Sequence, residues 1–132
     1  MSQENIEIVR AWFAAFEPSL DDVADFWHPD IDWRAIEGAP DDIGVFRGPE
    51  AMRRYYEQWY ETFDDLRAAP EELIDAGEQV VAVVHVTAQM KKSDSEIDMR
   101  MAIVLTLRDG KIARGREYAS KGQALEAAGL SE

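Results

Sequence analysis

The stretch EIDMRMAIVLTLRDGKIARGREY, residues 96–118, decides the fold of this chain. Apolar side chains fall on every second residue of the segment Ile97–Leu107, and a period of two predicts a strand with one apolar face. Asp109-Gly110 favours a tight hairpin turn, so residues 111–118 are predicted to run back as a partner strand. Glu117 is a lone carboxylate on one face of that partner strand. It lies amid three small residues of the same parity: Ala113, Gly115 and Ala119.

A second long strand is predicted from Val80 to Met90, because its two sets of alternating residues differ in chemistry. One face holds only apolar side chains. The other face carries His85, Thr87 and Gln89 beside two valines. A shorter strand is predicted over residues 31–35.

Helices are predicted on both sides of the short strand. Apolar residues at helical spacing indicate a first helix that ends near Phe16 and a short second helix that ends at His28-Pro29-Asp30. A third helix begins at Pro49, since proline suits the first position of a helix. Residues 120–128 are predicted to form a closing helix. Residues 66–76 are ambiguous, because Pro70 interrupts a segment that otherwise resembles a strand.

This order of elements, helices first and a run of strands later, predicts an α+β fold. The helices would pack on one face of a mostly antiparallel sheet. A strongly curved sheet of this kind can wrap around the N-terminal helices and leave a cone-shaped cavity open at one end. With 132 residues and no internal repeat, we expect a single domain spanning residues 1–132.

The composition excludes several classes of function. A net charge of -13 disfavours sequence-independent binding to nucleic acid and docking on anionic lipid. The chain has no cysteine, which excludes disulfides and thiolate chemistry, and its two histidines form no metal-ligand motif with the acidic residues. We therefore predict no metal and no cofactor. No long apolar run and no signal peptide are apparent, so the expectation is a soluble, cytoplasmic protein.

Five segments carry a resemblance to a known family: Trp12-Phe13, Phe26-Trp27-His28-Pro29-Asp30, Phe46-Arg47-Gly48-Pro49-Glu50-Ala51, Leu107-Arg108-Asp109-Gly110-Lys111-Ile112 and Arg116-Glu117-Tyr118. They resemble the SnoaL-like branch of the nuclear transport factor 2-like superfamily, which includes polyketide cyclases, ketosteroid isomerases and limonene epoxide hydrolases. The resemblance implies the cone-shaped, cystatin-like α+β barrel and a homodimer formed through the outer face of the sheet.

The resemblance also bears on activity. Limonene epoxide hydrolases use an arginine and an aspartate on a middle strand, where His85 and Thr87 stand here, so epoxide opening is not supported. Ketosteroid isomerases need a tyrosine on the first helix and an aspartate near the first strand. Trp12 and a residue near Arg34 occupy those places here, so ketosteroid isomerase chemistry is not supported either. SnoaL-type cyclases use an acidic residue on the last strand, which Glu117 matches.

From the same alignment, His85 and Glu117 are expected to point into the cavity as a hydrogen-bonded acid–base pair. The alternative is that the two side chains only satisfy each other's hydrogen bonds. Aromatic, methionine and threonine side chains are expected to bind a small apolar or aromatic ligand, or else to be ordinary core. These candidates are Trp12, Phe16, Trp33, Tyr56, Trp59, Thr87, Met99 and Met101.

Two hypotheses of function follow. In the first, the chain is an acid–base enzyme of isomerase, cyclase or hydrolase type that acts on an apolar or aromatic molecule. In the second, it is a non-catalytic ligand-binding or dimerisation domain.

Overall fold

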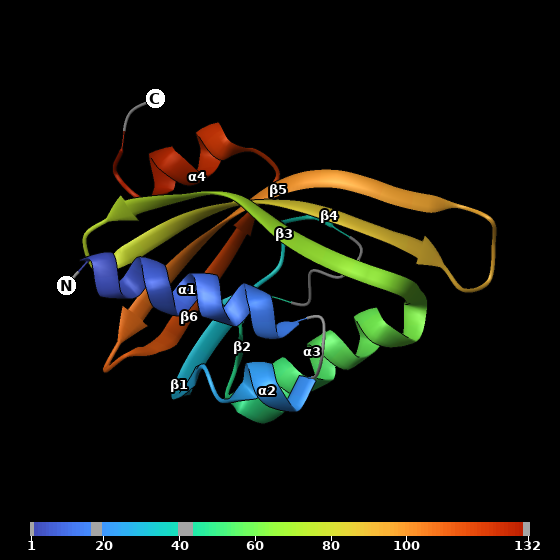
Figure 1. Cartoon of the computed structure of the whole chain (residues 1–132), viewed down its shortest axis with the longest axis horizontal. Helices are drawn as coiled ribbons and strands as arrows, with labels where there is room; N and C mark the ends of the chain where they lie inside the picture. The colour runs from blue at the N-terminus through green and yellow to red at the C-terminus, as the bar shows by residue number, and fades with distance from the viewer. Residues whose placement is uncertain (1, 17–19, 40–43, 131–132) are drawn as a thin grey trace.

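The part of the chain that the structure describes forms three layers: one helix, a curved six-stranded sheet, and three helices on the sheet's opposite face (Figure 1). A computed structural model describes residues 2–16, 20–39 and 44–130. The strand order is β2-β1-β6-β5-β4-β3, so the curled sheet is not closed into a barrel. The elements are α1 (Ser2–Phe16), α2 (Leu20–Ala24), β1 (Trp27–Arg34), β2 (Phe46–Arg47), α3 (Pro49–Thr62), β3 (Phe63–Ala76), β4 (Gln79–Met90), β5 (Glu96–Arg108), β6 (Lys111–Tyr118) and α4 (Lys121–Ala127).

The predicted α+β class and the curved sheet with N-terminal helices are confirmed. All sheet pairs are antiparallel except β1 with β6. The predicted hairpin joins β5 to β6, and both turn residues have positive φ, 55° at Asp109 and 75° at Gly110. Such angles suit a two-residue hairpin turn, which explains why the Asp-Gly dipeptide located it.

Two boundaries differ from the sequence-based expectation. The second helix ends at Ala24, and His28-Pro29 lies inside β1, because a residue before proline is pushed toward extended backbone. The ambiguous segment belongs to the long strand β3, where Pro70 is tolerated since β3 is an edge strand of the sheet.

A bulge in β6 changes which side chains share a face with Glu117. Thr106 pairs with Arg114 but Leu107 pairs with Ile112, so Ala113 is an extra residue in the ladder. Ile112 rather than Ala113 therefore joins the main core, while Gly115 and Glu117 keep the inward parity.

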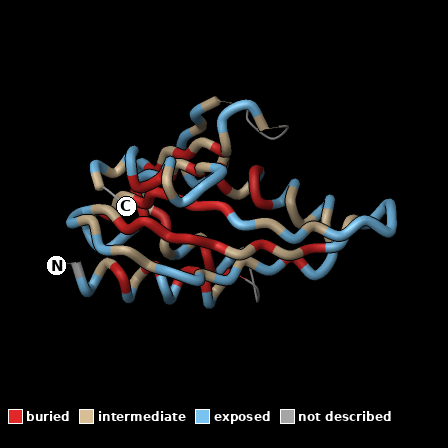
Figure 2. Tube along the Cα trace, turned by 90° about the horizontal axis from the view of Figure 1, so that it is seen from above, coloured by how far each residue is buried: buried red, intermediate tan, exposed pale blue. Residues whose placement is uncertain are grey.

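The main core lies between the sheet and helices α1 to α3, and a smaller cluster lies between the outer face of the sheet and α4. Figure 2 shows the buried residues concentrated in the middle of the molecule and the exposed tip of the β4–β5 hairpin projecting from it. Helix α1 packs against β3 and β4, and α3 packs against β1 and β3. The two helices thus close the concave side of the sheet and leave a space between them and strands β3, β4, β5 and β6.

Candidate functional site

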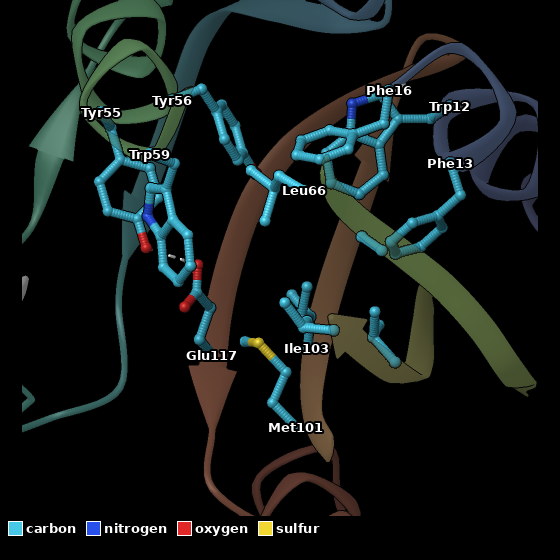
Figure 3. Close-up of a pocket in the computed structure, with 13 residues that line it drawn as sticks. Trp12, Phe13, Phe16, Tyr55, Tyr56, Trp59, Leu66, Met101, Ile103 and Glu117 are labelled. Carbon is cyan, nitrogen blue, oxygen red and sulfur yellow. Dashed lines mark hydrogen bonds between the residues drawn. The ribbon is translucent and has the colours of Figure 1, made fainter. Parts of the chain in front are cut away.

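An aromatic cavity lies between helices α1 and α3 and the concave face of the sheet (Figure 3). The cavity has a volume of about 50 Å³, which is room for a few water molecules. A ring-sized ligand therefore requires some lining side chains to turn. The lining residues are Trp12, Phe13, Phe16, Tyr55, Tyr56, Trp59, Leu66, Ala68, Val84, Val86, Met101, Ile103 and Glu117.

Glu117 is the one charged side chain among these lining residues, and it is only 9% exposed. Its Oε2 accepts hydrogen bonds from the indole Nε1–H of Trp33 at 2.8 Å and from the hydroxyl of Tyr55 at 3.0 Å. The second of these bonds is the dashed line in Figure 3, which joins β6 to α3. Two donors on one oxygen stabilise a buried carboxyl group and restrict its orientation.

Trp33 reaches Glu117 because β6 carries a glycine beside it. Trp33 on β1 pairs with Gly115 on β6, and an added Cβ on Gly115 would lie 2.1 Å from the indole ring. Only a residue without a side chain leaves room for a fully buried tryptophan in that position. The close approach of the two strands thus sets the position of one of the two donors to Glu117.

Tyr56, the neighbour of Tyr55 on α3, is packed against other rings in the same space. Its ring stacks on Trp27 with 6.1 Å between centroids and meets Trp33 and Phe16 edge-on. Burial, then the nearby charge of Glu117 and then Tyr60 raise the pKa of Tyr56 well above its ordinary value near 10. Tyr56 is therefore a neutral phenol at any physiological pH.

The expectation that His85 meets Glu117 inside the cavity is wrong. His85 lies on the outer face of the sheet, where its Nε2 is 2.6 Å from Oδ1 of the exposed residue Asp98. The side chains of β4 that line the cavity are its neighbours Val84 and Val86. Because adjacent residues of a strand point to opposite faces, the apolar set of β4 occupies the interior and the polar set faces outward. Thr87 lies two residues after His85 on the same outer face of β4, so it does not line the cavity as predicted.

The other predicted ligand-binding residues all lie on the concave side, although they play different parts. Trp12, Phe16, Tyr56, Trp59 and Met101 line the cavity. Trp33 stands behind Glu117 as its donor, and Met99 packs against the main core. Whether any of them binds a ligand stays a prediction.

Tyr55 is the main residue that the sequence interpretation missed. Helical spacing after Pro49 predicts one stripe through Met52, Tyr56, Trp59 and Phe63, and Tyr55 only flanks it. Its spacing of four residues from Trp59 was the available signal, since residues four apart on a helix share a face. Both Tyr55 and Tyr56 are in fact buried, because α3 is enclosed by β1, β2 and β3.

In the part of the chain that the structure describes, no group of three His, Asp or Glu side chains is placed to hold a metal ion. None of the described helices has the length and apolar character needed to cross a bilayer.

Comparison with known proteins shows which family the chain belongs to. The sequence pattern of the SnoaL-like domain matches residues 9–115, which is most of the chain. The chain therefore belongs to the SnoaL-like domain family, and its fold is that of the nuclear transport factor 2-like proteins. No curated protein matches it significantly in sequence.

Three solved structures illustrate the shared fold. A hypothetical protein with a ketosteroid isomerase-like fold from Catenulispora acidiphila, in complex with trimethylamine, has 21% identity and a TM-score of 0.74, covering 94% of this chain and 93% of its own. TerC, co-crystallised with polyporic acid, has 22% identity and a TM-score of 0.77 over 96% of this chain and 98% of its own. The epoxide hydrolase/cyclase-like enzyme SalBIII, which acts in pyran ring formation, has 20% identity and a TM-score of 0.75, covering 90% of this chain and 92% of its own.

Proposed function

We propose that this protein is an acid–base enzyme of cyclase or isomerase type, in which Glu117 moves a proton on a small apolar or aromatic molecule held in the aromatic cavity. The observation that carries the proposal is the carboxyl group of Glu117, the one charged group on the lining, held on one oxygen by two donors. A carboxyl group held in a cavity of this kind is suited to general acid–base catalysis.

The surroundings of Glu117 define what each part would do. The hydrogen bonds from Trp33 and Tyr55 hold the carboxyl group of Glu117 in one orientation. As a carboxylate, Glu117 would take a proton from a bound molecule and return it at another atom. The rings and aliphatic side chains of the lining would exclude bulk water and orient a flat ligand by contact.

The similar structures support a small molecule as the ligand. One was crystallised with polyporic acid and another with trimethylamine, and SalBIII acts in pyran ring formation.

Deuterium exchange tests the proposal without knowledge of the natural substrate. Phenylacetone in D₂O carries exchangeable C–H groups beside its carbonyl, and NMR follows their loss. We expect the protein to accelerate this exchange above the buffer rate and Glu117→Gln to lower the acceleration by about 10²–10⁴-fold. Glutamine keeps an acceptor for Trp33 and Tyr55, so the variant should fold.

His85→Ala is the matched control, because His85 lies on the opposite face of the sheet. It should leave the exchange rate unchanged. Equal rates for the wild-type protein and Glu117→Gln would refute the acid–base role.

A second candidate is the non-catalytic ligand-binding domain. It is favoured by the outward position of His85, which leaves Glu117 without the predicted imidazole partner. Binding of phenylacetone with no accelerated exchange would support this candidate. A homodimer through the outer face of the sheet also stays a prediction, which the mass of the protein in solution would test.

A further inference from the structure

A second, larger hollow lies on the outer face of the sheet, where α4 packs (Figure 1). This groove runs between the ends of β1 and β6, helix α4 and the segment around Val45, and its volume is about 850 Å³. Among the described residues, Glu117 alone lines both the groove and the aromatic cavity, and its carboxyl group is bound by Trp33 and Tyr55. The groove is therefore a separate space, with the size of an ordinary small-molecule site.

Three arginines line the groove because outward positions of β1 and β6 meet there. Arg34 and Arg116 are partners across the two strands, and Arg114 lies two residues before Arg116 on β6. Residues two apart on a strand point to the same face. Like charges directly opposite each other in a sheet are unfavourable, so this cluster requires negative charge beside it.

The carboxylates of the chain supply only part of that negative charge. Asp32 is shared, since its Oδ1 lies 2.7 Å from Nη2 of Arg116 and 3.7 Å from Nε of Arg114. Neither contact has the alignment of a hydrogen bond to that oxygen. Glu37 lies 4.0 Å from Arg34, and the side chain of Glu37 is 83% exposed. Each guanidinium has five N–H donors, so these contacts use only part of what the three arginines offer.

The groove also has an apolar side. Val45 is 48% exposed and is the one exposed large apolar side chain in the part of the chain that the structure describes. It lines the groove together with Ile36, Tyr118, Ala119 and Ala127. A single exposed valine needs no explanation by itself, but here an apolar surface borders a cluster of guanidinium groups. The combination suits a ligand with an apolar body and an anionic group.

We propose that the groove binds a small free molecule with a flat apolar body and one carboxylate or sulfonate group, which pairs with the arginines. A guanidinium can bind such a group through two parallel hydrogen bonds. Two exposed carboxylates on the lining, Glu37 and Glu126, disfavour a second negative charge on the ligand. The net charge of -13 disfavours an anionic membrane or an acidic protein as the occupant. This inference goes beyond the proposed function and does not depend on it.

The test compares two dyes with the same rings, 8-anilinonaphthalene-1-sulfonate and N-phenyl-1-naphthylamine, which differ only in the sulfonate. Fluorescence titration measures the affinity of each dye. We expect the wild-type protein to bind the sulfonate at least about tenfold more tightly than the neutral dye. Arg114→Gln should weaken sulfonate binding by about fivefold and Arg34→Gln/Arg114→Gln by at least about tenfold, as the loss of one and two partly exposed ion pairs implies. Both variants should change binding of the neutral dye by less than about twofold, which also verifies that they fold.

Arg108→Gln is the matched control, because Arg108 is exposed beside the β5–β6 turn and does not line the groove. It changes the net charge by the same amount as Arg114→Gln and should alter sulfonate binding by less than about twofold. The proposal would be overturned by equal affinities of the wild-type protein for the two dyes, by no loss in the double variant, or by the same loss in Arg108→Gln as in Arg114→Gln.

A second copy of the chain is the alternative occupant of the groove, and light scattering measures the mass in solution. A wild-type dimer that dissociates in Arg34→Gln/Arg114→Gln would make the groove an interface between copies and would also overturn the small-molecule proposal. An unchanged mass in the double variant, together with weakened sulfonate binding, supports it.

Discussion

Replacement of Gly115 by alanine tests whether the contact between β1 and β6 positions the carboxyl group of the site. The new Cβ would lie 2.1 Å from the ring of Trp33, and an ordinary contact begins at 3.4 Å. The ring must therefore withdraw by about 1.3 Å, a shift that also pulls its Nε1 away from Glu117 Oε2, now 2.8 Å distant. Trp33 is fully buried against Trp12 and Tyr56, so no empty space receives it.

The expected loss in the free energy of unfolding has two contributions. Overpacking of a filled core costs about 1–3 kcal/mol, and loss of a buried hydrogen bond to a carboxylate costs roughly 1.5–3 kcal/mol. We expect Gly115→Ala to lower the free energy of unfolding by about 3–5 kcal/mol and the midpoint of thermal unfolding by roughly 10–20 °C for a domain of this size.

Thermal and denaturant unfolding followed by circular dichroism measure this effect. Gly77→Ala is the matched control, because Gly77 has a φ of 79° but open space around its Cβ position. It should cost about 1 kcal/mol through backbone strain alone. A double-mutant cycle with Trp33→Phe completes the test, since the smaller ring makes room for the added methyl group. The reasoning is refuted if Gly115→Ala costs under 1 kcal/mol or if the two substitutions are additive.

Three further predictions concern other parts of the chain. Asp65 adopts a φ of 52° in the bulge at the start of β3, so Asp65→Gly should raise the free energy of unfolding by about 0.5–1 kcal/mol. The neighbouring change Asp64→Gly should lower the free energy of unfolding, and the midpoint of urea unfolding measures both effects. The raised pKa of Tyr56 implies that the folded protein keeps this proton above pH 10 while the unfolded chain loses it. Stability should therefore be fully present below pH 10 and decrease at higher pH, and absorbance at 295 nm should show fewer late-ionising tyrosines in Tyr56→Phe than in the wild type. On the outer face, the hydrogen bond from Arg100 lowers the pKa of Glu71 below its ordinary value of about 4.5. The stability that this exposed pair adds should be present above that pH and be lost as the pH falls further, and Glu71→Gln or high salt should flatten this part of an acid unfolding curve.

Much of the architecture was predictable because it follows from local periodicity. The alternation along β5 placed Met101 and Ile103 on the concave side, and the Asp-Gly turn placed the hairpin that carries Glu117. The spacing of Trp12 and Phe16 located the buried face of α1. Each of these patterns depends on side chains two to four residues apart, whose relative directions the backbone geometry imposes.

His85 shows where the inference failed. The two faces of β4 were separated correctly, and the fully apolar face was the natural candidate for the interior. The resemblance to relatives with polar residues on a middle strand directed the polar face inward instead. In this chain the interior positions beside the cavity are Val84 and Val86, so the hydrophobic pattern was the better guide to which face is buried.

The sequence by itself located most of the helices, the long strand β4 and the hairpin of β5 and β6, since these depend on neighbours along the chain. It left β3 ambiguous and did not indicate β2, and the inward direction of Glu117 was expected from the family resemblance. Only the tertiary structure decided what Glu117 meets, because its two donors lie 84 and 62 residues away and arrive through the pairing of β1 with β6 and the packing of α3. Local patterns carry no information on the register between distant elements. That register depends on how large and small side chains fit together in the core, as the ring of Trp33 fits against Gly115.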